Sequence, residues 1–287
     1  MSTLSLQDLP PFRNEPLTDF HDPAQRQAMT EALAKVQSEL GRRYPMIIGG
    51  QEITLDETEN SINPARPWEV VGVFPKGGVE HVNLAVEAAT QAFQTWQYTS
   101  AGQRAKYLVD AAAQMRERKH EFSAWMVFEA GKSWAEADAD TAECIDFLEY
   151  YARQRLRLAQ PVELAPFEGE EDALQYIPLG AGAIIPPWNF PAAIPGGMCA
   201  AAMVAGNTVV LKPAPATPTI AWHFHRLMTD VGVPPGVFNF ITGPGPVLGD
   251  ALVDHPKTRF IAFTGSVATG LRIHERAAKV HPGQMWI

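Results

Sequence analysis

The sequence predicts an α/β fold in which helices cover both faces of a parallel β-sheet and a helical region precedes the sheet. Three observations support this prediction. From Gly180 onward, short apolar runs alternate with helical segments, as in repeated strand–helix units. Before that point, apolar residues recur every three or four positions, which is the period of an amphipathic helix. Hydrophobic residues make up 46% of the 287 residues and charged residues 19%, which is enough apolar side chain for a well-buried core.

The N-terminal half contains the helical periodicity. The expected helices cover residues 29–40, 82–96, 108–115, 122–130 and 135–158. Gly41 ends the first of these apolar stripes, as glycine often does at a helix C-terminus. Between the first two helices, Gly49 and Gly50 can take the positive φ angles of a tight turn, so we expect a β-hairpin there.

Residues 161–178 form a segment of different character. Residues 162–164 alternate in polarity, 168–172 make an acidic turn, and 174–177 can return as a second strand. Because an isolated hairpin is marginally stable, we expect an arm that projects and pairs with another subunit to form a homo-oligomer. The alternative is a surface hairpin packed on its own domain. The domain prediction is therefore one nucleotide-binding domain, residues 1–160 and 179–287, interrupted by an oligomerisation arm.

The second half predicts the parallel sheet. Expected strands cover residues 183–185, 208–211, 237–241 and 260–263, and expected helices cover 191–205, 219–231, 246–253 and 267–280. Ligands of such sheets bind at the carboxyl ends of the strands, so the loops that follow the strands are the candidate site.

Composition and charge exclude several classes of protein. The formal net charge of −9 argues against a nucleic-acid partner. No charged residue occurs between Asp172 and Lys212, but repeated prolines make buried strands and helices a better explanation than a membrane span. The two cysteines are too few for a disulfide framework, so we expect a cytoplasmic protein, with the mitochondrial matrix as the alternative. No residue pattern suggests a metal site.

The loop after the first strand of the sheet reads Pro-Pro-Trp-Asn-Phe-Pro, residues 186–191. Its prolines and aromatic residues make it stiff, and Asn189 offers a side-chain amide at the sheet edge. A fixed amide donor suits an oxyanion hole, which must not reorganise as charge develops on oxygen. The alternative, favoured by spacing alone, is that Asn189 caps the following helix.

The next three strands end in loops whose residues suit a phosphate-bearing ligand. Lys212 can donate three hydrogen bonds to ribose hydroxyls or phosphate, although a solvated loop lysine is the commoner case. Gly245 allows close approach to the backbone or simply makes a turn. Thr264, Gly265 and Ser266 precede a helix whose free N–H groups can bind an anion. The standard glycine-rich nucleotide fingerprints do not occur.

In their order and spacing, the segments PPWNFP, LKPA, ITGPG and FTGS closely resemble the aldehyde dehydrogenase superfamily. The resemblance covers essentially the whole chain and implies the superfamily's Rossmann-like sheet. GRRYPMIIGGQEI and FEAGKSWAEADADTAECIDFLEYYAR further resemble the branch that oxidises L-glutamate γ-semialdehyde to glutamate with NAD in proline breakdown. The implied partner is a small aldehyde. An aldehyde dehydrogenase of another substrate branch remains an alternative.

The resemblance also implies roles for individual residues. Asn189 corresponds to the oxyanion-hole amide, and Glu129 and Phe190 match positions that line the substrate site. The cofactor-binding matches are Lys212 at the adenosine ribose, Gly245, Gly265 and Ser266 around the pyrophosphate and adenine, and Trp188 and Thr264 along the cofactor toward the nicotinamide.

One position departs from the family pattern. Many NAD-preferring members carry a glutamate three residues after the lysine, where it binds ribose hydroxyls and repels a 2′-phosphate. Pro215 stands there in this chain, so the use of NADP remains open.

The resemblance further implies that the family's catalytic cysteine and glutamate lie beyond Ile287. Cys144 and Cys199 have no basic neighbour in sequence, and we expect both to be small buried apolar residues. The chain alone is therefore expected to be the cofactor-binding part, without the C-terminal catalytic domain and inactive. The alternative is a nucleotide-binding module that never had catalytic activity.

Overall fold

The computed structural model describes residues 4–281 and 283. The helices are η1 (Leu6–Asp8), α1 (Pro23–Glu39), α2 (Val79–Trp96), α3 (Ala101–Glu117), α4 (Lys119–Ala130), α5 (Trp134–Leu158), α6 (Ala193–Val204), α7 (Pro218–Asp230), α8 (Gly245–Asp254) and α9 (Val267–Val280). The strands are β1 (Arg42–Arg43), β2 (Met46–Ile48), β3 (Gln51–Ile53), β4 (Thr58–Asn63), β5 (Arg66–Pro75), β6 (Ala181–Ile185), β7 (Thr208–Leu211), β8 (Phe238–Phe240) and β9 (Phe260–Phe263). Every predicted helix and every predicted strand of the main sheet overlaps an observed one.

The main sheet has six strands in the order β3-β2-β8-β7-β6-β9. β8, β7, β6 and β9 are parallel, as predicted. The prediction of a purely parallel sheet is wrong at one edge, because the β2–β3 hairpin joins antiparallel to β8 through Ile47 and Phe240. Gly49 (φ 60°) and Gly50 (φ 81°) make the hairpin turn as expected. The hairpin covers an edge strand that would otherwise be open.

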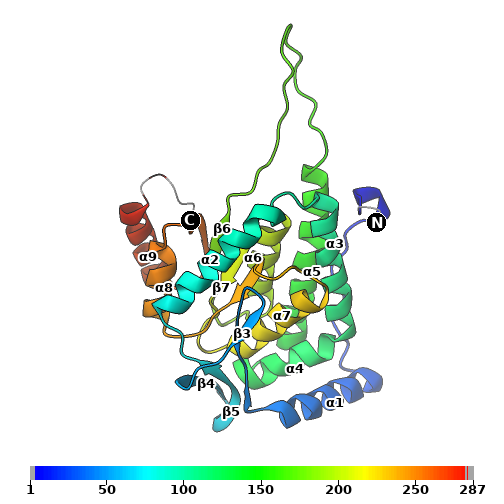
Figure 1. The fold of residues 1–287 in the computed structure, drawn as a ribbon. Coiled ribbons are helices and arrows are strands. Elements are labelled where there is room, and N and C mark those ends of the chain that lie inside the picture. The colour runs from blue at the N-terminus through cyan, green and yellow to red at the C-terminus, as the bar shows by residue number, and fades with distance from the viewer. Residues whose placement is uncertain (1–3, 282, 284–287) are drawn as a thin grey trace.

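Helices cover both faces of this sheet (Figure 1). Val209 and Leu211 of β7 contribute to the core that contains α6 and α7, whereas Val210 between them packs in a second core with Val82 and Val86 of α2. Successive side chains of a strand point to opposite faces, so a strand buried on both faces must be apolar throughout. This explains the uninterrupted apolar run of residues 209–211.

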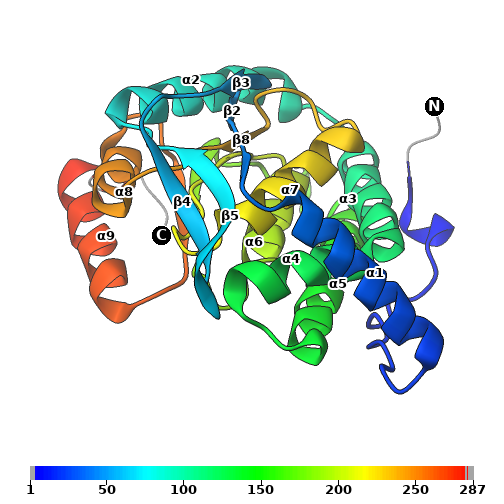
Figure 2. The same ribbon diagram turned by 90° about the horizontal axis from the view of Figure 1, so that it is seen from below.

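A second sheet, in the order β1-β5-β4, was not predicted. In Figure 2 the β4–β5 ribbon lies beside α4 and α7, and contacts join β4 to α4 and β5 to α7. Residues 58–63 read Thr-Glu-Asn-Ser-Ile-Asn, with only Ser61 and Asn63 buried. Because the side chains that turn inward are polar, this strand lacks the apolar alternation by which strands are recognised.

Residues 161–178 leave the body of the protein as a long projecting arm (Figure 1). Its turn lies at Glu168 and Gly169. The predicted strands at 162–164 and 174–177 are wrong for this chain, since neither leg of the arm has strand structure. The arm packs on no core of its own, and an isolated pair of strands gains too little from its own hydrogen bonds to stay paired.

Two helical glycines give a matched test of packing. A Cβ atom at Gly196 in α6 would lie 2.5 Å from the Sγ atom of fully buried Cys144 in α5, whereas a Cβ at Gly249 in α8 would meet nothing within 4 Å. Gly196→Ala should therefore lower the free energy of unfolding by about 1–3 kcal/mol through overpacking. Gly249→Ala should raise it by up to about 1 kcal/mol through helix propensity. Urea denaturation measures both, and a stabilised Gly196→Ala variant would contradict the close packing of α5 on α6.

Candidate functional site

The connections of the parallel strands create a cleft at one edge of the sheet. From β6 the chain moves outward through β7 to β8, and it then crosses back to place β9 on the other side of β6. The loops after β6 and β9 therefore diverge, which opens a crevice at the carboxyl ends of the two strands. A cavity of about 770 Å³ lies there, between the loop from Pro186 to Asn189 and the start of α9.

The cleft brings together most of the predicted site residues. Those that line it are Trp188, Asn189, Lys212, Gly245, Thr264, Gly265 and Ser266. Pro215 lines it as well, so the position without the family's glutamate faces the same cavity. Asp250, Thr269 and Arg272 also line it and were not predicted. The one available signal was the helical period, which puts Thr269 and Arg272 on the same face of α9 as Ser266.

Asn189 lies in an exposed part of the loop between β6 and α6. The residue at the N-cap of α6 is Ala192, which has no capping side chain, and the first N–H of the helix donates to the carboxylate of Asp140 in α5, not to Asn189. The alternative that Asn189 is a helix cap is therefore wrong, and its amide stays available at the cleft. Neighbouring Trp188 is 58% exposed and also faces the cleft.

The start of α9 forms the opposite wall of the cleft. Ser266 is the N-cap residue, and its Oγ accepts a hydrogen bond from the backbone N–H of Thr269 at 3.3 Å. A helix N-terminus has N–H groups without partners inside the helix and a positive partial charge. This end of α9 is therefore suited to a phosphate group.

Lys212 is the most unusual residue of the cleft because its side chain is charged and yet the residue is only 5% exposed. Its Nζ donates a hydrogen bond to the Pro213 carbonyl at 2.8 Å, the one bond that it makes within residues 4–281 and 283. Burial lowers the pKa of Lys212 to about 8, and the nearby Glu59 carboxylate partly opposes this shift. An ammonium group has three donors, so Lys212 retains donors for a ligand with hydroxyl or anionic oxygens.

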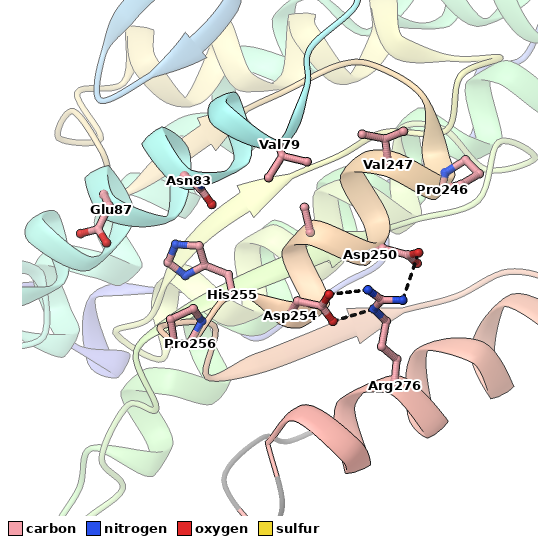
Figure 3. Close-up of a pocket in the computed structure, with 11 residues that line it drawn as sticks. Val79, Asn83, Glu87, Pro246, Val247, Asp250, Asp254, His255, Pro256 and Arg276 are labelled. Carbon is pink, nitrogen blue, oxygen red and sulfur yellow. Dashed lines mark hydrogen bonds and ion pairs between the residues drawn. The ribbon is translucent and has the colours of Figure 1, made fainter.

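Ion pairs between α8 and α9 hold this wall together. Arg272 pairs with Asp250 at 2.5 Å, and Arg276 pairs with Asp250 at 3.2 Å and also with Asp254. Figure 3 shows Arg276 directed at both carboxylates, beside a groove between α2 and α8. Exposed pairs of this kind add little stability singly, but a network of them fixes the relative position of the two helices.

Glu129 does not lie at the cleft. It is 2% exposed, and its carboxylate accepts hydrogen bonds from the N–H groups of Thr219 and Ile220 and from the Ser61 hydroxyl, at 2.7–2.9 Å. Burial raises the pKa of Glu129, and these donors counteract the rise. Glu129 thus anchors the N-terminus of α7. Its assignment to a substrate site stays a prediction.

Phe190 is 41% exposed and follows Asn189, although it does not line the cleft. Lys132 lies over its ring, with Nζ 4.2 Å from the ring centroid. The predicted contact of Phe190 with substrate also stays a prediction.

Both cysteines are fully buried, and burial raises the pKa of each thiol. The prediction that Cys144 and Cys199 behave as small apolar core residues is confirmed. Neither can serve as an accessible thiolate.

The described part of the chain contains no group of three or more His, Cys, Asp or Glu side chains arranged to hold a metal ion. None of the described helices is long and apolar enough to cross a bilayer.

The switch in strand order, the cleft beside it and the helix N-terminus together define a doubly wound α/β protein, a class whose members bind ligands at the switch point. The aldehyde dehydrogenase family model matches residues 53–285, so the chain belongs to the aldehyde dehydrogenase family.

Three relatives within the family are pyrroline-5-carboxylate dehydrogenases. The chain is 55% identical over 277 residues to a 1-pyrroline-5-carboxylate dehydrogenase of Geobacillus kaustophilus, an alignment that covers 96% of this chain and 54% of that protein. A Thermus 1-pyrroline-5-carboxylate dehydrogenase solved with bound NAD is 46% identical with a TM-score of 0.94, covering 97% of this chain and 55% of that one. A Mycobacterium tuberculosis Δ-pyrroline-5-carboxylate dehydrogenase with bound NAD is 28% identical with a TM-score of 0.89, covering 97% and 53%. The chain spans about half the length of the curated relatives it matches.

Replacing the buried lysine should stabilise the fold in a pH-dependent way. The pKa of Lys212 is about 8 in the folded chain, whereas the ordinary value for a lysine, which we take for the unfolded chain, is 10.5. The unfolded chain therefore holds the proton more tightly. The protonated lysine therefore destabilises the fold below about pH 8, and this penalty disappears as the pH rises toward 10.5. Lys212→Met should raise the free energy of unfolding by about 2 kcal/mol near pH 7 and by much less near pH 10.

Urea denaturation at the two pH values measures the difference. Lys257→Met is the matched control, because Lys257 is half exposed and pairs with Glu87 away from the cleft. A gain for Lys212→Met that is equal at both pH values would mean that desolvation of the ammonium is not its origin.

Proposed function

We propose that the chain is the NAD-binding part of an aldehyde dehydrogenase that oxidises L-glutamate γ-semialdehyde to glutamate, a reaction of proline degradation. The observation that carries the proposal is the cleft at the switch point, where a helix N-terminus and an incompletely partnered, buried lysine meet. The choice of substrate rests on the similarity to the 1-pyrroline-5-carboxylate dehydrogenases named above. The two free cysteines suit the reducing cytoplasm, in which we place the protein.

The residues of the cleft fit a dinucleotide by their chemistry. With NAD bound, Lys212 would donate to ribose hydroxyls, while Gly265 and Ser266 at the start of α9 and Gly245 at the start of α8 would hold the pyrophosphate and adenine end. Trp188 and Thr264 would contact the part of the cofactor toward the nicotinamide. NAD, when bound, supplies the acceptor for a hydride.

Asn189 supplies an amide donor for an oxygen that gains negative charge. Such a donor is effective when its position is fixed before the reaction, since it then needs no reorganisation. The stiff loop from Pro186 to Pro191 satisfies this requirement.

The cofactor proposal is NAD, with NADP also accommodated. Pro215 lines the cleft and carries no charge, so at this position no carboxylate repels a 2′-phosphate.

A second candidate function is a nucleotide-binding module without catalysis of its own. The burial of Cys144 and Cys199 favours it for the 287-residue chain taken alone. The two candidates share the cofactor site and differ in turnover.

Isothermal calorimetry with NAD⁺ on the purified 287-residue chain tests the shared site. We expect binding, and we expect Lys212→Met to weaken it by about tenfold or more because a hydrogen bond from a charged donor is lost. Lys257→Met, which removes a lysine outside the cleft, should leave the affinity unchanged. Failure of the wild-type chain to bind NAD⁺ would refute the proposal.

A parallel assay of γ-semialdehyde oxidation should give no turnover with this chain alone. If turnover were seen and Cys144→Ala or Cys199→Ala abolished it, a buried thiol would have to become exposed and react. That result would contradict the proposal that this chain binds the cofactor and carries no nucleophile.

We further propose that the arm, residues 161–178, mediates association with a second copy of the protein. Its apolar side chains are exposed, with Phe167 at 67% and Ile177 at 79%. Its extended legs carry backbone N–H and C=O groups that can pair with a strand from a partner, as in β-strand addition.

Light scattering of the double variant Phe167→Asp/Ile177→Asp tests this role. We expect the wild-type chain to be an oligomer and the variant to have the mass of a monomer, because charge disfavours burial of the arm. Trp68→Asp is the control, since Trp68 is 81% exposed on β5, outside the arm. An unchanged mass for the arm variant would exclude the arm as the interface.

A further inference from the structure

Lys132 lies just after α4 and reaches across to α5. Gly131 ends α4 in the left-handed conformation (φ 68°), which turns the chain so that Lys132 faces Asp140. The Lys132 Nζ atom lies 2.8 Å from Asp140 Oδ2, and the two side chains are 12% and 0% exposed. A buried pair of this kind is costly to break, because removing one partner leaves an uncompensated charge.

The second carboxylate oxygen of Asp140 binds the backbone of another segment. Asp140 Oδ1 accepts a hydrogen bond from the N–H of Ala193 at 2.7 Å, and Ala193 is the first residue of α6. A carboxylate at a helix N-terminus interacts favourably with the helix dipole. Because no side chain within the loop caps α6, Asp140 in α5 serves as its anchor from outside.

Lys132 contacts the same loop at a second point. Its Nζ lies 4.2 Å from the centroid of the Phe190 ring, within the range of a cation–π interaction. Phe190 directly follows Asn189, so the two anchors lie on either side of Pro191. The segment from Phe190 to Ala193 is thus held by one ion pair, between Lys132 just after α4 and Asp140 of α5.

We propose that Lys132 and Asp140 are positioning residues that fix the loop bearing Trp188 and Asn189 at the mouth of the cleft. What this loop does rests on the proposed function, but its anchoring rests on the contacts alone. An amide donor held in advance is what stabilisation of a developing oxyanion requires. The pair thereby connects the helical N-terminal half of the chain to the loop that carries Asn189.

A second buried ion pair, between α4 and α5, provides a matched control. Lys119 of α4 pairs with Asp138 of α5 at 3.0 Å, with side-chain exposures of 10% and 2%. Lys119 also bonds to Pro16 and Thr18 of the N-terminal segment, and it does not contact the cleft loop. Lys119→Met and Lys132→Met therefore remove equally buried charges. The first releases the N-terminal segment near Thr18, and the second releases the loop that contains Phe190.

Hydrogen–deuterium exchange of the full 287-residue chain, followed by mass spectrometry, tests the proposal. Lys132→Met should speed exchange of the amides of Ala193 and Ile194, which donate to Asp140 Oδ1 and to the Phe190 carbonyl, by about tenfold, the size expected for loss of a buried cation–π contact and its ion pair. Lys119→Met should leave these amides unchanged and speed exchange near Thr18. Lys132→Arg, which keeps the charge and can stack on Phe190, should restore slow exchange.

Phe190→Leu tests the contact between Lys132 and the loop without removing a buried charge, so it serves even where the charge variants fold poorly. It removes the ring and leaves Asp140 with both of its partners, so exchange should rise at Ile194, whose amide donates to the Phe190 carbonyl, and stay slow at Ala193. Equal exchange of these two amides in Lys132→Met and Lys119→Met, or unchanged exchange at Ile194 in Phe190→Leu, would overturn the proposal.

Calorimetry with NAD⁺ separates this result from the proposed function. A loop released in Lys132→Met, in a chain that fails to bind NAD⁺, would leave the anchoring established and refute the cofactor role. A chain that binds NAD⁺ but shows no change in loop exchange would refute the anchoring alone.

Discussion

The structure depends on a constraint of parallel sheets, namely that all carboxyl ends of the strands meet at one edge. β6 lies between β7 and β9. The chain leaves β6 toward β7 and later returns from β8 to β9 on the other side of β6, so the loops after β6 and β9 diverge. The cleft is the direct result. Asn189 and Lys212 follow strands that are buried throughout, β6 and β7, whereas Thr264 to Ser266 follow β9, which is only partly buried.

A rigid sheet does not by itself make its loops rigid. In this chain, carboxylates from the helical half bind the helices that follow two of the loops. The Glu129 carboxylate binds the N-terminus of α7, and the Asp140 carboxylate binds the N-terminus of α6. Both helices follow loops that line the cleft. Each carboxylate is almost fully buried, and burial raises the pKa of each, which the chain tolerates because backbone N–H donors and Lys132 compensate. Lys212 is compensated less fully, by one hydrogen bond to the Pro213 carbonyl and by the nearby Glu59 carboxylate, and its pKa stays lowered.

Much of the architecture was predictable because its signals are local. The apolar runs at 208–211 and 260–263 identify strands, and the Gly49-Gly50 pair identifies a hairpin turn. Seven predicted site residues do line the cleft. The sheet of β1, β4 and β5 was missed because residues 58–63 turn polar side chains inward. The strands predicted in the arm are absent because its two legs pack on no core of their own.

The sequence by itself determined the order of elements, the loops that carry the site and the family to which the chain belongs, since periodicity and motif spacing are properties of neighbouring residues. Only the tertiary structure decided that Glu129 anchors α7, that Asp140 and Lys132 hold the loop of Asn189, and that Lys212 is buried. The Lys132–Asp140 pair is local, but the contacts of Glu129 with α7 and of Asp140 with α6 join segments more than 50 residues apart along the chain, as Asp140 and Ala193 are. Burial and partner geometry at such distances arise when helices pack on a sheet, and no local pattern encodes them.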